Sequence, residues 1–204
     1  LYSLTNATLV GILEDHILSV LRVGATSALG ARCLARRDAS VVGIFGAGKH
    51  ARTQLHGMCA VRPIEAVRVY SPTATNRERF AEQLATDLGI EVRPVDAPRR
   101  AVEGCDIVVT ATNANQPVLD GEWLVPGQHV ITLNGSDAHH KRQEIDETTV
   151  RRSSVIVANY REQIQRDEQP PLFPALQKGI LRWEQIHELG AVLHGRAAGR
   201  STDD

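Results

Sequence analysis

The sequence has few of the features that mark membrane-spanning, secreted or nucleic-acid-binding proteins. Its 204 residues carry a formal net charge of −1, which gives no indication of a nucleic-acid partner. No apolar run approaches the ~20 residues that a helix needs to cross a bilayer, so we expect no membrane partner. The three cysteines (Cys33, Cys59 and Cys105) are scattered, without C-x-x-C spacing. We therefore expect the cysteines to be reduced packing residues, and the protein to be cytoplasmic.

Metal-binding and nucleophile patterns are scarce as well. His139 and His140 are adjacent, so their side chains point apart, and no third ligand follows at a short spacing. We therefore predict no metal site. The sequence also lacks a Ser/His/Asp or Cys/His set at a recognised spacing. An initiating Met is missing, and the first residues, 1–4, are typical of the middle of a strand, so we expect a segment of a longer protein.

Alternating strand and helix patterns dominate the middle of the chain. Residues 1–15 predict two short strands, and 16–36 predict a helix whose small residues require close packing on a neighbour. Further strands are predicted at 41–45, 66–70, 91–94, 107–111 and 129–133. Helical stretches are predicted at 52–61, 76–88, 98–102 and 121–124. This order predicts an α/β fold with a doubly wound parallel sheet.

The last fifty residues give weaker patterns. A short strand at 154–157 is expected to add to the edge of the sheet. After the break at Pro170-Pro171, a helix is expected at 183–189. The tail at 195–204 is rich in Gly, Arg and Asp, and we expect it to be poorly ordered.

The clearest local motif is a glycine turn after the first strand of the predicted sheet. Gly46, Gly48 and Ala51 have the G-x-G-x-x-G/A spacing of a Rossmann-type dinucleotide-binding turn. The first glycine permits the turn, the second lets a pyrophosphate approach the backbone, and the small Ala51 permits close helix–strand packing. Backbone N–H groups of the helix that follows would bind the phosphates. The backbone of Ala47, Lys49 and His50 belongs to the same candidate site. The alternative is an ordinary strand–helix turn.

The end of the second sheet strand bears on the choice of dinucleotide. NAD sites usually have an acidic residue there, which binds the ribose hydroxyls. This chain has Ser71 and Thr73 instead, and Arg77 follows on the next helix. Hydroxyls and a guanidinium suit a 2′-phosphate, so NADP(H) is favoured and NAD(H) is the alternative. These residues also fit a simple turn, with Asn76 as helix N-cap and the arginines on a solvated face.

Three blocks of sequence resemble the ornithine cyclodeaminase/mu-crystallin family. The first is residues 21–32, LRVGATSALGAR, similar to the family's L-R-T-[GA]-A-x-S-A-L-A-A helix. The second is the glycine turn at 46–51. The third is residues 134–146, NGSDAHHKRQEID, similar to the family's G-[GA]-D-x-x-x-K-x-E-L-D segment. Residues 190–196 also resemble the family's L-G-x-[VL]-x-x-G-R stretch.

The chain departs from the family pattern at several points. Val23 replaces the usual Thr, Lys49-His50 replaces x-Gln, and one extra residue follows Lys141. Family members are also longer at both ends. The resemblance therefore implies a remnant of the substrate and dimerisation domain at 1–36, an NAD(P)-binding Rossmann domain at 37–160, and a truncated helical segment at 161–204. It also implies a homodimer for the full-length protein.

The resemblance implies roles for individual side chains. Arg22 would bind a substrate carboxylate, and Asp137 would act as the acid/base group beside the substrate α-carbon. Lys141 and Asn134 would contact the cofactor. Thr110 and Thr112, at the end of the fourth sheet strand, would lie near the ribose and nicotinamide. The alternatives are a structural ion pair for Arg22, a capping turn for residues 134–137, and ordinary strand positions for the threonines.

The resemblance implies an NAD(P)-dependent oxidoreductase that acts at the α-carbon of a small amino or imino acid. A ketimine or imine reductase is favoured, because the residues after the second strand suit NADP(H). One alternative is an ornithine cyclodeaminase, which forms proline and ammonia. Another is a non-catalytic, crystallin-like NADP(H)-binding protein, and the segment itself could lack activity.

Overall fold

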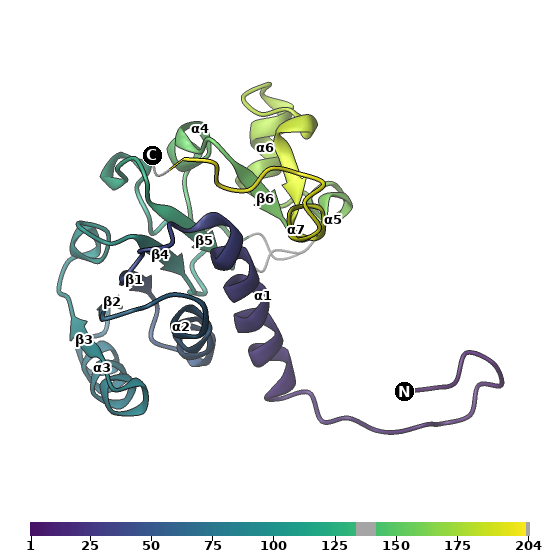
Figure 1. The fold of residues 1–204 in the computed structure, drawn as a ribbon, viewed down its shortest axis with the longest axis horizontal. Helices are drawn as coiled ribbons and strands as arrows, with labels where there is room; N and C mark the ends of the chain where they lie inside the picture. The colour runs from purple at the N-terminus through teal and green to yellow at the C-terminus, as the bar shows by residue number, and fades with distance from the viewer. Residues whose placement is uncertain (134–141, 203–204) are drawn as a thin grey trace.

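The computed structural model describes residues 1–133 and 142–202. Five parallel strands form its central sheet in the order β3-β2-β1-β4-β5 (Figure 1). They are β1 (Val41–Phe45), β2 (Ala66–Tyr70), β3 (Glu91–Pro94), β4 (Ile107–Thr110) and β5 (His129–Thr132). The strand order reverses between β1 and β4, and ligands bind outside the carboxyl ends of the strands at such a switch point. The predicted α/β sheet is thereby confirmed, although β4 and β5 each end one residue earlier than expected.

Three helices cover one face of the sheet: α1 (Leu18–Leu34), α2 (Lys49–Val61) and α3 (Ala74–Leu88). Val42 and Ile44 of β1 point into this layer and are fully buried. Phe45 points to the opposite face, which is covered by the short helices η1 (Pro98–Ala101) and η2 (Gly121–Trp123) and by adjoining loops. Burial on both faces explains why the central strands β1 and β4 are nearly continuous apolar runs.

The small residues of α1 allow it to pack closely on α2. A Cβ added to Gly24 would lie 2.5 Å from the carbonyl oxygen of Thr53. A Cβ added to Gly57 on α2 would lie 2.8 Å from the carbonyl oxygen of Gly24. Neither distance is compatible with a side chain, so both glycines are required by this helix contact. The close packing predicted for this helix is confirmed, and it fixes α1 beside the glycine turn.

The C-terminal elements surround a separate small core (Figure 1). They are α4 (Glu147–Arg152), β6 (Ile156–Ala158), α5 (Arg161–Arg166), α6 (Leu172–Gln177), η3 (Trp183–Gln185) and β7 (Ile186–Glu188). Helix α7 (Leu189–Leu193) follows β7 and contacts α1. The strand expected at the sheet edge is β6, but it pairs with β7 in a two-stranded parallel sheet of its own. The prediction of a helix at 183–189 was therefore wrong, because pairing with a distant strand makes residues 186–188 extended.

Both ends of the described chain also differ from expectation. Residues 1–15 contain no regular strand, only an isolated bridge between Tyr2 and Leu9. Their apolar side chains, such as Leu4 and Ile12, are exposed, so no packed face stabilises a pair of strands. At the other end, the Arg200 guanidinium donates hydrogen bonds to the carbonyl oxygens of Leu34 (2.6 Å) and Gly127 (3.0 Å). The tail up to residue 202 is therefore hydrogen-bonded to the rest of the protein, and the expectation that it is poorly ordered was wrong for these residues.

Among the described residues, no helix combines the length and apolar content that crossing a bilayer requires.

Candidate functional site

The glycine turn between β1 and α2 has the geometry that its spacing predicted. Gly46 has φ 108°, and a Cβ there would lie 2.3 Å from the carbonyl oxygen of Ala111, so only glycine fits. Ala51 is fully buried against the sheet. Gly48 differs from Gly46, because a Cβ added to it would meet no atom within 4 Å. The protein thus leaves open space over Gly48.

The start of α2 offers an anion site beside that space. Gly48 is the N-cap and has no side chain to cap the helix. The N–H groups of the first turn, which begins with Lys49 and His50, have no partner within the helix and carry partial positive charge. A pyrophosphate group fits this combination of open space and free donors. The residues present therefore suit a dinucleotide.

His50 lies close enough to Arg22 of α1 for the two side chains to interact electrostatically. Burial lowers the pKa of His50, and the positive charges of Lys49 and Arg22 lower it further. The imidazole is therefore neutral at pH 7, and Arg22 supplies the cation. Arg22 is exposed and forms no ion pair with any residue in 1–133 or 142–202. The structural ion pair considered as an alternative for Arg22 is absent from that part of the chain.

The residues expected to select the dinucleotide lie together after β2. Arg77 Nη1 donates a hydrogen bond to the carbonyl oxygen of Ser71 (3.0 Å), which places the guanidinium at the end of the strand. Ser71 is buried, and Thr73 is exposed at the N-cap of α3. Thr73 therefore occupies the N-cap that the alternative gave to Asn76. Two hydroxyls and one guanidinium accordingly flank the end of β2.

The ends of β4 and β5 meet at a buried carboxylate, Glu144, whose role the sequence did not indicate. Thr110 and Thr112 both donate side-chain hydrogen bonds to it, at 3.3 Å and 2.7 Å. Thr132 and the backbone of Leu133 donate to it from the end of β5, both at 3.2 Å. Thr110 is fully buried, so its hydroxyl faces Glu144 and not open space. The only sequence signal for Glu144 was its place in the third matching block.

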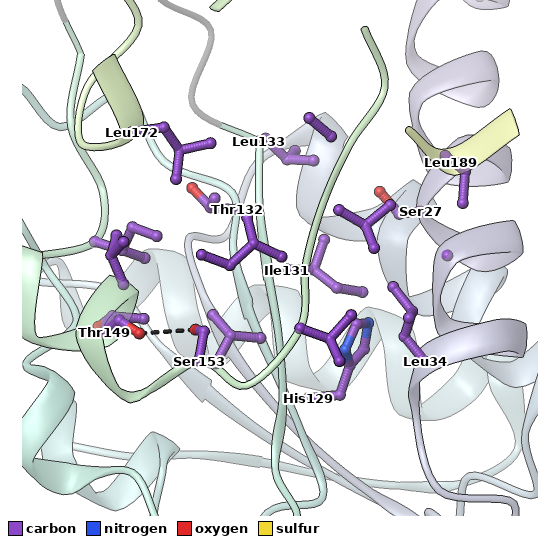
Figure 2. A pocket seen from close by; sticks show the side chains of 18 of the residues that line it. Ser27, Leu34, His129, Ile131, Thr132, Leu133, Thr149, Ser153, Leu172 and Leu189 are labelled. Atoms are coloured by element: carbon purple, nitrogen blue, oxygen red, sulfur yellow. Dashed lines mark hydrogen bonds between the residues drawn. The ribbon is translucent and has the colours of Figure 1, made fainter. Parts of the chain in front are cut away.

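A cavity of about 1090 Å³ lies between α1, β5 and the chain around β6. Arg22, His50 and Thr112 line it, so the carboxylate-binding candidate, the glycine-turn helix and the end of β4 share one space. Figure 2 shows Ser27 and Leu34 of α1 facing His129 and Ile131 of β5 across part of this cavity. A concave space lined by both apolar and polar side chains is suited to a small polar molecule.

His129 is expected to make the protein less stable in mild acid. Its Nε2 atom is shielded from solvent without a hydrogen-bond partner, although the residue as a whole is half-buried. Burial, and then the charges of Arg200 and Arg62, lower the pKa of His129 to about 4. Between about pH 6.5 and 4 the unfolded chain binds a proton here that the folded chain does not. The free energy of unfolding should therefore fall by roughly 2–3 kcal/mol as pH drops through that range.

Urea denaturation at pH 7.5 and 4.5 measures this effect, with His129→Leu to remove the titrating group. The variant should lose less stability over the pH change than the unmodified protein does, because other groups titrate equally in both. An identical loss in the two proteins would show that His129 does not cause it.

Three candidate residues lie outside the described part of the chain: Asn134, Asp137 and Lys141. Their roles rest on the sequence. Within the described residues, no three His, Cys, Asp or Glu side chains are grouped so as to hold a metal ion.

Comparison with known sequences identifies the relatives of this chain. The sequence profile of the ornithine cyclodeaminase/mu-crystallin family matches residues 1–204. An uncharacterised cyclodeaminase of Sinorhizobium fredii is 38% identical over 193 residues, which cover 94% of this chain and 57% of that protein. A Delta(1)-pyrroline-2-carboxylate reductase of Bacillus cereus is 31% identical over 196 residues, which cover 96% of this chain and 59% of the reductase. The chain thus spans less than two thirds of these relatives' length.

The similar solved structures are also enzymes of amino- and imino-acid chemistry. The Delta(1)-pyrroline-2-carboxylate reductase of Thermococcus litoralis, in complex with NADH and L-proline, superposes with a TM-score of 0.91 at 32% identity. The match covers 99% of this chain and 62% of that one. An archaeal alanine dehydrogenase dimer with bound NAD superposes with a TM-score of 0.85 at 26% identity, covering 100% of this chain and 61% of that one.

Proposed function

Because the chain belongs to the ornithine cyclodeaminase/mu-crystallin family, we propose that it forms the dinucleotide-binding part of an NAD(P)-dependent imino-acid reductase. The observation that carries this proposal is the meeting of Arg22, His50 and Thr112 in one cavity, with open space over Gly48 at the start of the helix that carries His50. The solved reductase holds NADH and L-proline, and proline is the reduced form of a cyclic imino acid. A cyclic 2-imino acid such as Delta(1)-pyrroline-2-carboxylate is therefore the proposed substrate class.

The proposed roles follow from the chemistry of each side chain. When bound, the reduced nicotinamide supplies a hydride to the imine carbon. Arg22 binds the substrate carboxylate through two N–H···O bonds and fixes which atom faces the cofactor. Asp137 delivers the proton that the imine nitrogen takes up, a role that rests on its place in the matching block. The apolar wall formed by residues such as Leu34 and Ile131 limits the access of water.

A spectrophotometric assay tests the reaction. Oxidation of NADPH or NADH with Delta(1)-pyrroline-2-carboxylate, and formation of one proline per cofactor consumed, would support the reductase. Ammonia release from ornithine without net cofactor change would support the cyclodeaminase instead, the activity named for the Sinorhizobium relative. Tight cofactor binding without either turnover would support a binding protein.

For the cofactor, we propose NADP(H) in preference to NAD(H). Ser71, Thr73 and Arg77 surround the end of β2, where a 2′-phosphate would lie, and no acidic residue stands there. The solved relatives are complexes with NADH or NAD, so this preference would distinguish the chain from them. Titration with NADPH and NADH under the same conditions tests it, and equal or tighter binding of NADH would contradict it.

We also propose that the whole protein is a homodimer and that residues 1–36 belong to its dimerisation and substrate domain. The solved archaeal relative is a dimer, and several apolar side chains of residues 1–21 are exposed here. Sedimentation analysis tests the dimer, and a monomer at micromolar concentration would contradict it.

A further inference from the structure

We propose that Glu144 is a positioning residue that sets the nicotinamide end of the site without touching the cofactor. It would do so by holding the ends of β4 and β5 in one fixed arrangement. The proposal rests on the dinucleotide function above. It concerns the ends of β4 and β5, whereas the glycine turn, which receives the pyrophosphate, follows β1.

The first argument is the pattern of donors around the carboxylate. Oε1 accepts hydrogen bonds from the backbone N–H and the hydroxyl of Thr112, directly after β4. Oε2 accepts from the Thr110 and Thr132 hydroxyls and from the Leu133 N–H, at the ends of β4 and β5. Each oxygen therefore serves more than one donor, and together they join two neighbouring strand ends. A carboxylate offers about four lone-pair sites in a plane, which suits such a junction.

The second argument is the position of the backbone of the same residue. The Glu144 carbonyl oxygen accepts hydrogen bonds from the N–H groups of Val118 (2.9 Å) and Leu119 (3.2 Å). Residue 144 is thus fixed to the loop that leaves β4 as well as to the strand ends. This anchoring holds the carboxylate against small movements, which is what a positioning group requires.

The third argument is burial. Glu144 is 1% exposed, so water cannot replace its hydrogen bonds if the carboxylate is lost. Thr112 lines the same cavity as Arg22 and His50. A shift of Thr112 would therefore move the cavity wall. Thr132, which lines the same cavity, stands at the end of β5, one strand further from the glycine turn.

The test compares two ligands that share one end. ADP-ribose contains the pyrophosphate and both riboses of NADH but lacks nicotinamide. Glu144→Gln replaces one acceptor oxygen with a donor NH₂, which clashes with the donors around it. We expect this variant to raise the Kd for NADH at least tenfold and to raise the Kd for ADP-ribose, which keeps the ribose near the end of β4 but lacks nicotinamide, by a clearly smaller factor.

Glu147→Gln is the matched control, since Glu147 is three residues away and pairs with Arg151 and Lys178 at the surface. It should change neither Kd. Equal weakening of both ligands by Glu144→Gln, or unchanged NADH binding, would overturn the positioning role. If the unmodified protein bound neither ligand and did not bind NADPH either, the dinucleotide function itself would fail.

A second variant covers the case in which Glu144→Gln does not fold. Thr132→Val removes one donor from the end of β5 at nearly constant volume. It should raise the Kd for NADH about threefold, leave the Kd for ADP-ribose unchanged and keep the melting temperature within a few degrees. Unchanged NADH binding in this variant would count against the proposal, as would equal effects on both ligands.

Discussion

A Gly48→Ala variant is expected to fold as stably as the unmodified protein but to bind the dinucleotide at least 100-fold more weakly. The added Cβ meets no protein atom within 4 Å, and the backbone of Gly48 (φ −104°, ψ −174°) is ordinary for alanine. Neither the packing nor the backbone conformation of the protein therefore requires glycine at position 48. The open space is where a pyrophosphate would approach the backbone, and a methyl group would displace it from the donors of α2.

The controls for this variant are two other glycines. Gly190→Ala, in α7, also places a Cβ in open space, so it should leave both stability and cofactor binding unchanged. Gly46→Ala forces a Cβ to 2.3 Å from the carbonyl oxygen of Ala111 at a positive φ, so it should lower stability by several kcal/mol. Thermal melts and NADPH titration measure both properties. Undiminished cofactor binding by Gly48→Ala would show that the phosphates lie elsewhere.

The contrast between Gly46 and Gly48 shows which part of the candidate site could be predicted from the sequence. The turn could be predicted because its geometry is local: strand, glycines and helix lie within about a dozen residues. The central strands β1 and β4 were predicted for the same reason, since burial on both faces makes each a nearly continuous apolar run. The close contact of α1 and α2 followed from the small residues of α1, although the partner helix could not be named.

Glu144 shows what a single sequence does not reveal. Its carboxylate binds Thr110, which lies 34 residues earlier in the chain, and Thr132, which lies 12 residues earlier. Nothing in the local pattern around Glu144 distinguishes a buried junction from a solvated acid. The error at 183–189 has the same origin, because Ile186 is extended through pairing with Ile156 of β6. The apolar residues of 1–15 were misleading for a different reason, since they predicted two strands for which the described chain offers no packed face.

An Arg22→Ala variant is expected to lower kcat/KM for Delta(1)-pyrroline-2-carboxylate at least 100-fold, mainly through a higher KM. Two charge-assisted hydrogen bonds to the carboxylate, at roughly 1.5–3 kcal/mol each, account for that factor. Stability should not change, because Arg22 is exposed and forms no ion pair with the residues that the structure describes. Arg32→Ala is the matched control, since Arg32 is exposed on the same helix but does not line the cavity.

The assignment of Arg22 to the carboxylate can be separated from a general effect on the cavity by changing the substrate. Delta(1)-pyrroline has the same imine ring but no carboxylate, so the unmodified protein should use it far less well. Arg22→Ala should reduce turnover of this compound only slightly, and the preference for the carboxylated substrate should largely disappear. Equal losses on both substrates would mean that Arg22 shapes the cavity or the cofactor site. The carboxylate would then have to be bound by another residue.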